Sequence, residues 1–158
     1  MATSLMYSIV YTIERPVQER IPQLIRWTVP PDPYIRLNTD GSAIGNPWLA
    51  SAGGILCDSS GGWFFGFSSN LGIITNNMAE LAALWQGLLL AWDLGFKFIQ
   101  IELDSSTVLS WLTNRHALYP PDMMSLIYDC RSLMEQEWEM QAGHIYREAN
   151  GCADALAK

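Results

Sequence analysis

Basic residues are scarce in this chain of 158 residues, which has 9 Lys and Arg against 16 Asp and Glu and a formal net charge of -7. A broad basic surface that holds nucleic acid by neutralising phosphates is therefore disfavoured, because that mode of binding depends on many Lys and Arg side chains. A phosphate that binds here would need help from a cation. Taken alone, the acidity is better explained as a feature that keeps the protein in solution.

Cysteine and histidine are also few. The three cysteines form an odd number with no CxxC pair, which argues against a disulfide framework or a zinc site and favours a reducing, intracellular compartment such as the nucleus or the cytoplasm. The only histidines are His116 and His144, so a histidine-rich metal site is excluded. The cysteines are Cys57, Cys130 and Cys152.

Long apolar segments are absent as well. No apolar run reaches the roughly 18 residues that a membrane span requires. The first 13 residues are moderately apolar, but they lack the basic segment and the cleavage site of a secretory signal. We therefore expect neither a membrane segment nor a secreted protein.

What the chain does contain is enough apolar surface for one folded domain, with 49% hydrophobic residues and a mean hydropathy of +0.08. Residues 1–33 differ from the rest, because five of the eight prolines fall there and no periodic pattern is sustained. Proline removes a backbone donor and interrupts regular structure. We expect a proline-rich linker or upstream remnant over residues 1–33 and a domain over residues 34–158.

The periodicity of residues 34–158 predicts strands first and helices later. Residues 34–40 alternate as a strand does, and two apolar runs, 49–57 and 62–71, flank a turn-rich segment typical of a hairpin. Residues 78–94 are helical in length and composition, with Thr75, Asn76 or Asn77 as the cap. The remaining elements are expected to be a strand at 96–103, helices at 105–114 and about 122–137, a strand at 138–146 and a helix from residue 150.

This order of elements predicts an α/β fold. The first three strands can form an antiparallel meander, and the two later strands, which are separated by helices, should add as parallel neighbours. The expected architecture is a five-stranded mixed sheet with helices on both faces.

Glu80 is the most informative acid. It is the only ionisable side chain between Ile73 and Trp92, and it shares a helix face with Leu84, Gly87 and Ala91. An unpaired carboxylate buried on such a face would cost several kcal/mol, so a cation should offset it. The alternative is a partly exposed acid near the start of the helix, which the helix dipole favours. The local pattern leaves both interpretations open.

Three more acids stand at the ends of expected elements. Asp40 ends the first strand, Asp104 ends the fourth, and Asp154 lies in the first turn of the last helix. Each has an ordinary explanation by itself, as a turn residue, a helix cap or a helix-start acid. If the first and fourth strands are neighbours, however, Asp40 and Asp104 meet at one edge of the sheet. Their mutual repulsion would be relieved by Mg²⁺, which prefers oxygen ligands.

Five segments of the chain resemble the ribonuclease H family, and four of them carry one of these acids each in the family's order. The resemblance runs from about Arg36 to the C-terminus and is greatest to plant ribonuclease H-like domains of the retrotransposon type. The segments are NTDGSAIGNP (38–47), AGGIL (52–56), TNNMAELAAL (75–84), IELDSS (101–106) and REANGCADALA (147–157).

The resemblance implies a ribonuclease H-like fold and an endonuclease that hydrolyses the RNA strand of RNA–DNA hybrids with two Mg²⁺ ions, Mn²⁺ being a possible substitute. The partner would be nucleic acid, and the chain would act as a monomer. Asn76 and Asn77 resemble the pair that contacts the minor groove of the hybrid, and Gly41 and Ser42 would contact its RNA strand. The metal ligands implied are Asp40, Glu80, Asp104 and Asp154.

In the loop before the last acid, many relatives carry a mobile histidine that assists product release. Arg147 is better placed for that role here than His144, which is expected to lie within a strand. Simpler alternatives are a surface arginine and a strand histidine.

Two departures from the family pattern favour functions other than cleavage of the hybrid. The basic handle that some bacterial relatives use to grip the hybrid is missing, because the link from Asn114 to Asp122 has only Arg115 as a basic residue. The chain also ends four residues after Asp154, so its last helix is expected to be truncated. The alternative functions are therefore a catalytically weak or inactive nucleic-acid-binding module and an inert fragment.

Overall fold

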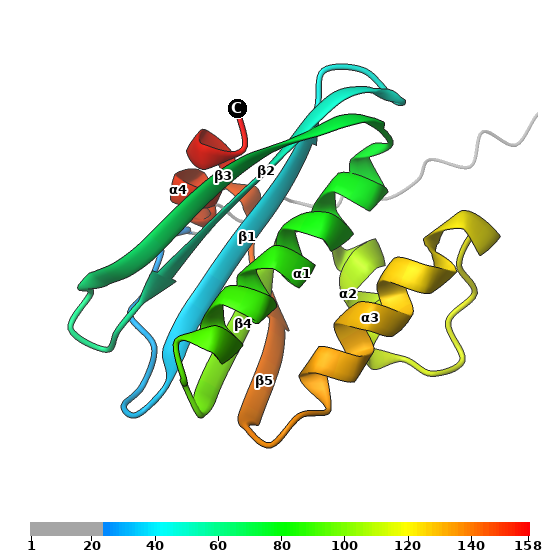
Figure 1. Ribbon diagram of the computed structural model, residues 1–158. Coiled ribbons are helices and arrows are strands. Elements are labelled where there is room, and N and C mark those ends of the chain that lie inside the picture. Colours follow the sequence, from blue (N-terminus) through cyan, green and yellow to red (C-terminus); the bar gives the residue numbers. More distant parts are fainter. Residues whose placement is uncertain (1–23) are drawn as a thin grey trace, which may run out of the picture.

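The computed structural model describes residues 24–158, and the part of the expected linker at residues 1–23 lies outside the described residues (Figure 1). Residues 24–33 form no helix or strand, but they contact the domain. The Trp27 indole nitrogen donates a hydrogen bond to Asn38 Oδ1 at 3.1 Å, and Arg36 donates one to the backbone carbonyl of Thr28. The described part of this segment is therefore attached to the first strand of the sheet.

The five strands form one mixed sheet in the order β3-β2-β1-β4-β5. β1 pairs antiparallel with β2, and β2 with β3, whereas β4 is parallel to β1 and β5 is parallel to β4. This arrangement confirms the predicted sheet of three antiparallel strands and two parallel ones. The strands are β1 (Ile35–Ala43), β2 (Trp48–Cys57), β3 (Trp63–Ile74), β4 (Phe98–Leu103) and β5 (Glu139–His144).

Helices cover both faces of the sheet, as predicted. α1 lies across one face with α3 beside it, and α4 lies on the other face (Figure 1). Two short 3₁₀ turns, η1 (Pro121–Met123) and η2 (Arg147–Ala149), precede α3 and α4. The helices are α1 (Asn76–Asp93), α2 (Ser106–Thr113), α3 (Met124–Met134) and α4 (Gly151–Leu156).

The main core lies between the sheet and α1. Leu37 of β1 and Leu84 and Leu88 of α1 are completely buried, together with Ile99, Ile101 and Leu103 of β4. Gly87 allows the close approach of α1, because a β carbon there would stand 2.8 Å from a methyl group of Leu37. α1 therefore sits directly on β1, and the functional ends of both elements are fixed relative to each other.

Several expected boundaries shift by a few residues. Thr75 is the cap of α1, since its hydroxyl oxygen accepts a hydrogen bond from the Met78 amide at 3.3 Å. β4 begins at Phe98 rather than residue 96, because the Phe96 amide closes the end of α1 on the Ala91 carbonyl after Gly95, which has a φ of +79°. α3 ends at Met134 rather than near 137.

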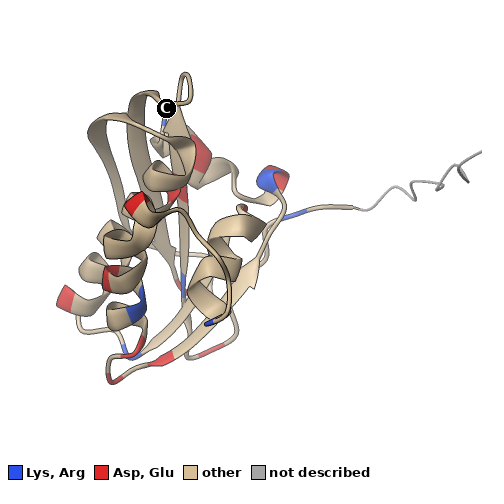
Figure 2. Cartoon of the chain, turned by 90° about the vertical axis from the view of Figure 1, so that its right-hand side faces the viewer, with Lys and Arg blue, Asp and Glu red and all other residues tan. Residues whose placement is uncertain are grey.

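β1 and β3 are longer than expected and β5 is shorter. β1 continues past Asp40 because its pairing with β2 runs on to Ala43 opposite Ala50. Charged residues are spread thinly over the described part of the chain, as Figure 2 shows. Among the described residues, no helix combines the length and the apolar character needed to cross a membrane.

Candidate active site

Three acids from three elements meet at one end of the sheet. β1 and β4 run parallel with Asn38 opposite Glu102, so Asp40 and Asp104, two residues further along, lie side by side. Glu80 approaches from the first turns of α1. One oxygen from each of the three carboxylates lies within 4.8 Å of the others. The structure thus brings together three of the four acids that the sequence singled out.

Gly41 explains why Glu80 reaches Asp40. A β carbon at Gly41 would stand 2.1 Å from the backbone carbonyl carbon of Ala79, so the N-terminal part of α1 rests on the backbone of β1. No side chain separates the two elements at this point. The residue that the resemblance offered as an RNA contact therefore also has a packing role.

Burial and mutual repulsion disfavour the ionised form of these carboxylates. Asp40 is 1% exposed and Glu80 is 9% exposed, which rules out the partly exposed helix-start acid as an interpretation of Glu80. Burial, followed by the charge of Asp40, raises the pKa of Glu80 to about 9. Burial, followed by the charge of Asp104, raises the pKa of Asp40 to about 6. Burial also raises the pKa of Asp104, although Arg147 opposes the change.

The cluster has unused hydrogen-bonding capacity. Asp40 Oδ2 and Glu80 Oε2 are buried and have no hydrogen-bond partner among the described residues. Buried oxygens in that state are costly, and a divalent cation that prefers oxygen ligands would satisfy them and relieve the repulsion. Asp40, Glu80 and Asp104 are therefore the residues that fit a divalent metal.

Asp154 lies next to this cluster but outside it. Its charge is close enough to raise the pKa of Asp40, yet its carboxylate is engaged by basic groups. Arg147 approaches Asp154 Oδ1 at 3.5 Å, and Lys158, one helical turn further on, also pairs with it. The hydrogen bond from Lys158 is the main reason that the pKa of Asp154 is lowered.

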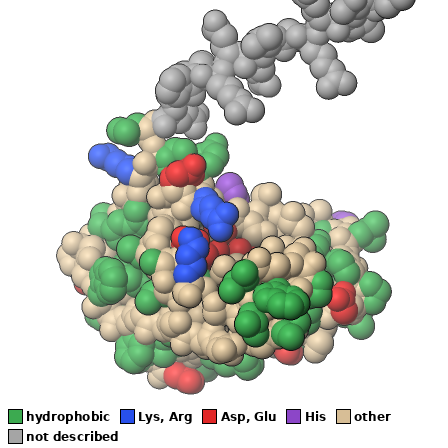
Figure 3. All heavy atoms as spheres, turned by 90° about the horizontal axis from the view of Figure 1, so that it is seen from above, with side chains coloured by type: hydrophobic (Ala, Val, Ile, Leu, Met, Phe, Trp, Pro, Cys, Tyr) green, Lys and Arg blue, Asp and Glu red, His purple; other side chains and the backbone are tan. Residues whose placement is uncertain are grey.

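A hollow of about 430 Å³ opens beside the acids, with Glu80 and Asp104 in its lining. In Figure 3, which looks onto this end of the molecule, red acidic atoms lie sunk between blue basic side chains. The lining includes six residues that the sequence singled out, with Asp104 and Ser105 forming the side that follows β4. The residues around it are Gly41, Ser42, Ala43, Asn76, Glu80, Asp104, Ser105 and Arg147.

The two asparagines before α1 are placed differently. Asn76 lines the hollow and accepts a hydrogen bond from the Ala43 amide at 3.0 Å, which ties the start of α1 to the end of β1. Asn77 does not line the hollow. Ser105 does, although the sequence offered it only as part of a helix start. Its hydroxyl oxygen caps α2 by accepting from the Val108 amide at 3.2 Å.

The two candidates for the family's mobile histidine are both near the acids. His144 is the last residue of β5, and its Nε2 lies 3.1 Å from the backbone carbonyl of Asp104. Arg147 is 70% exposed and reaches Asp154 from η2. The arginine is therefore the freer of the two side chains.

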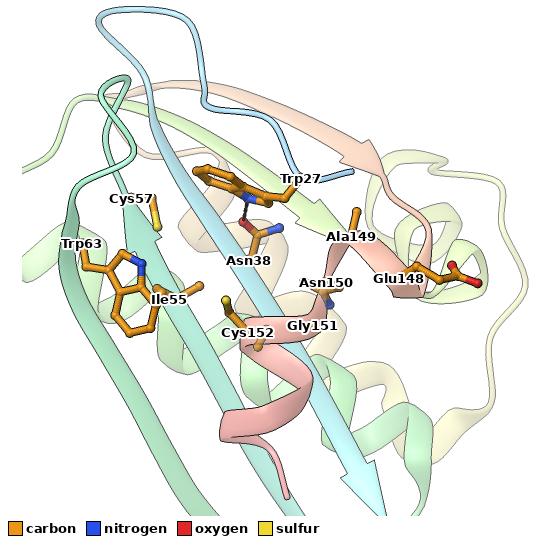
Figure 4. A pocket seen from close by; sticks show the side chains of 11 residues that line it. Trp27, Asn38, Ile55, Cys57, Trp63, Glu148, Ala149, Asn150, Gly151 and Cys152 are labelled. Carbon is orange, nitrogen blue, oxygen red and sulfur yellow. Dashed lines mark hydrogen bonds between the residues drawn. The ribbon is translucent and has the colours of Figure 1, made fainter. Parts of the chain in front are cut away.

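A second cavity, of about 280 Å³, lies on the α4 face of the sheet and contains none of the four acids (Figure 4). Trp27, Trp63 and Cys152 are among its walls. Asn150, at its floor, is 1% exposed and donates a hydrogen bond from Nδ2 to the Thr39 carbonyl at 3.0 Å. This bond fastens the start of α4 to β1 beside Asp40, and so helps to place Asp154.

Both the sequence and the fold of this chain are similar to those of known proteins. A family model described as reverse transcriptase-like matches residues 38–158. The ribonuclease HI of Halobacterium salinarum is 33% identical over 153 residues, which are 96% of this chain and 77% of that protein. The chain belongs to the ribonuclease H family.

Other members of the family are similar over most of the chain. An Arabidopsis thaliana protein named as a ribonuclease H protein is 37% identical over 140 residues, or 89% of this chain, but the chain spans only 22% of its length. The crystal structure of the Halobacterium salinarum RNase H1 has a TM-score of 0.75 and covers 78% of this chain and 94% of that one. An RNase H1 solved in complex with RNA/DNA hybrid has a TM-score of 0.72 at 27% identity, covering 78% and 93%.

Proposed function

We propose that this chain is a metal-dependent endonuclease that hydrolyses the RNA strand of RNA–DNA hybrids, with Mg²⁺ as its metal. The observation that carries the proposal is the cluster of Asp40, Glu80 and Asp104, three carboxylates held within 4.8 Å without a compensating hydrogen bond on two of their buried oxygens. Such an arrangement is costly for folding unless a cation occupies it. Functional sites are where costs of this kind are expected.

The chemistry assigned to this site follows from its ligands. When bound, two Mg²⁺ ions would supply the chemistry that activates a water molecule and stabilises the leaving oxygen of a phosphodiester. Asp40, Glu80 and Asp104 would hold the metal, and Asp154 would complete the set once it is released from Lys158. The buried position of Asp40 keeps its carboxylate fixed, so the phosphate meets a preorganised site.

The hollow beside the acids supplies the substrate contacts in this proposal. Ser42 and the backbone of Gly41 would face the RNA strand, and Asn76 and Asn77 would reach the minor groove, where ribose hydroxyls distinguish RNA from DNA. Arg147 would attract the phosphate near the acids and help product leave. Support comes from the RNase H1 relative solved with RNA/DNA hybrid, whose fold this chain shares.

The first test is hydrolysis of a labelled RNA–DNA hybrid with Mg²⁺ and with chelator. Asp40→Asn keeps the size of the side chain but removes a charged ligand, and Asp122→Asn, an exposed acid away from the cluster, serves as the matched control. Cleavage of the RNA strand that needs metal, persists in Asp122→Asn and is lost in folded Asp40→Asn would support the proposal. A folded wild-type chain that never cleaves the hybrid would contradict it.

A second candidate function is a nucleic-acid-binding module with little catalysis. The engagement of Asp154 by both Arg147 and Lys158 favours it, because a metal must displace those groups. Hybrid binding that is equal with metal and with chelator, in the absence of cleavage, would establish this alternative. Cleavage in the assay above would exclude it.

A further inference from the structure

β3 forms an edge of the sheet and lacks the charged residues and prolines that discourage pairing with another strand. Among residues 24–158 it pairs only with β2, so its outer backbone groups face away from the sheet (Figure 1). No charged residue and no proline occurs between Asp58 and Glu80, a stretch that contains the whole strand. The opposite edge strand, β5, is shorter and carries Glu139 and His144.

Exposed apolar side chains gather at both ends of β3. The N-terminal end is aromatic, with Trp63 66% exposed, Phe64 50% and Phe65 48%. The C-terminal end exposes 65% of Ile73, and its neighbour in β2, Leu49, is 50% exposed. Between the two ends lie small polar residues, Ser68, Ser69 and Asn70.

Natural sheets usually protect such an edge with lysine, proline, inward-pointing charges or bulges, because an open edge binds any compatible strand. β3 uses only bulges, one near each end, where its register with β2 shifts. Between them Phe65–Asn70 pairs regularly with Ser51–Leu56. This central stretch can accept a further strand with ordinary sheet geometry.

In place of the monomer expected from the sequence, we propose that the partner of this edge is β3 of a second copy of the chain, added antiparallel about a two-fold axis. A two-fold axis through an antiparallel pair must pass between one residue and its own copy. With Ser68 on that axis, Phe67 lies opposite Ser69 and Gly66 lies opposite Asn70, within the regular stretch between the bulges. The aromatic end of each copy thus meets the aliphatic end of the other.

The order of side chains makes the strand complementary to itself. Aromatic side chains near aliphatic or β-branched ones are favourable cross-strand neighbours, and a small serine at the centre can lie opposite its own copy without a clash. An uncharged strand also avoids the like-charge repulsion that a symmetric pairing would impose on a chain with a net charge of -7. A charged partner strand would find no complementary charge on β3.

The dimer would leave the acids open. The hollow lined by Glu80 and Asp104 lies at the ends of β1 and β4 and the start of α1, and β2 separates β1 from the edge that pairs. Two hollows would therefore sit on one continuous sheet, each accessible by itself. This inference does not depend on the proposed nuclease activity.

The test measures the molar mass of the intact chain in solution by sedimentation over a range of concentrations. Ser68→Lys places a charge at the centre of the proposed pairing, and Ala142→Lys places the same charge on the exposed edge strand β5 as a control. Circular dichroism checks that both variants fold. We expect a dimer for the wild type and for Ala142→Lys, and at least tenfold weaker association for Ser68→Lys.

Hydrogen exchange gives a second readout that needs no variant. Amides of residues 65–70 should become more protected as the wild-type concentration rises, whereas those of residues 139–144 should not change. A wild-type chain that stays monomeric, a dimer that Ser68→Lys leaves intact, or open-ended aggregates in place of a dimer would each overturn the proposal.

Discussion

Gly41 lies directly against the backbone of Glu80, so that a β carbon at position 41 would stand 2.2 Å from the Glu80 nitrogen. This contact sets the distance between β1 and the start of α1. It therefore sets the distance between Asp40, the residue before the glycine, and the Glu80 carboxylate. The geometry of the acid cluster depends on the absence of a side chain at one position.

Gly41→Ala should consequently damage the site as well as the packing. The added methyl group must push α1 away from β1, and overpacking of this kind costs about 1–3 kcal/mol of unfolding free energy. We expect hybrid cleavage to fall by more than about tenfold, since small displacements of catalytic groups have large effects on rate. Thermal unfolding and initial cleavage rates check this expectation.

Gly143→Ala in β5 is the matched control, because no atom lies within 4 Å of the position where its β carbon would stand. It should unfold and cleave like the wild type. If Gly41→Ala did the same, the backbone contact would have no bearing on the site.

The raised pKa of Glu80 predicts how stability depends on pH without metal. Burial raises this pKa from 4.5 to about 9, so between those values the native chain holds a proton that the unfolded chain has released. The unfolding free energy should therefore fall as pH rises through this window. In chelator at pH 8, Glu80→Gln should be more stable than the wild type by at least about 1 kcal/mol.

Divalent metal should reverse that order. Mg²⁺ binds the ionised carboxylate, so it should stabilise the wild type and have little effect on Glu80→Gln. Chemical denaturation at several pH values, with Mg²⁺ and with chelator, measures both effects. The exposed Glu137→Gln should follow the wild type throughout. A wild-type chain as stable at pH 8 as at pH 5 in chelator would argue against a protonated Glu80.

Lys158 should weaken metal binding by occupying Asp154. It pairs with that carboxylate one helical turn away and lowers its pKa. In Lys158→Gln, the Mg²⁺ concentration for half-maximal hybrid cleavage should drop. A change of about twofold to fivefold is expected, because Lys158 is largely exposed and such pairs are worth less than about 1 kcal/mol.

Lys97→Gln is the control for Lys158→Gln, since Lys97 lies over the ring of Trp92 at the far end of α1. Its Mg²⁺ requirement should stay unchanged. A higher requirement in Lys158→Gln would mean instead that this lysine assists the substrate or the metal.

Two ion pairs of different burial should contribute very differently to stability. Arg36 and Glu102 approach to 3.3 Å with side chains only 6% and 13% exposed, whereas Arg115 and Glu135 are 80% and 64% exposed. Glu102→Ala leaves a buried guanidinium without its carboxylate and should cost about 3–5 kcal/mol. Glu135→Ala should cost less than about 1 kcal/mol. Urea denaturation of the two variants makes the comparison, and equal losses would contradict it.

Much of the fold could be predicted from the sequence because its signals are local. The alternation of residues 34–40, the turn at Asp58 and the proline-free helix after Thr75 act over a few residues each, and they predicted the order of strands and helices. The boundaries were less predictable. β1 runs on to Ala43 because β2 continues to pair with it, and a partner strand is not a local property of the chain.

The four acids also differ in how far the sequence alone could predict their placement. Asp40, Glu80 and Asp104 could be proposed together because two strand ends and a helix start must meet if the strands are neighbours. Only the tertiary structure showed that Asp154 lies beside the other three and pairs with Arg147 and Lys158. The position of Asp154 relative to the other acids depends on how α4 is fastened to β1 through Asn150.

The sequence by itself determined the order of the elements, the identity of the acids and the uncharged character of β3, because each of these properties depends on residues that are close together in the chain. The tertiary structure alone decided that Gly41 admits the backbone of α1, that Glu80 is buried and that β3 is left at an open edge. These properties depend on contacts between residues far apart in the chain, and such contacts form only when the whole sheet packs.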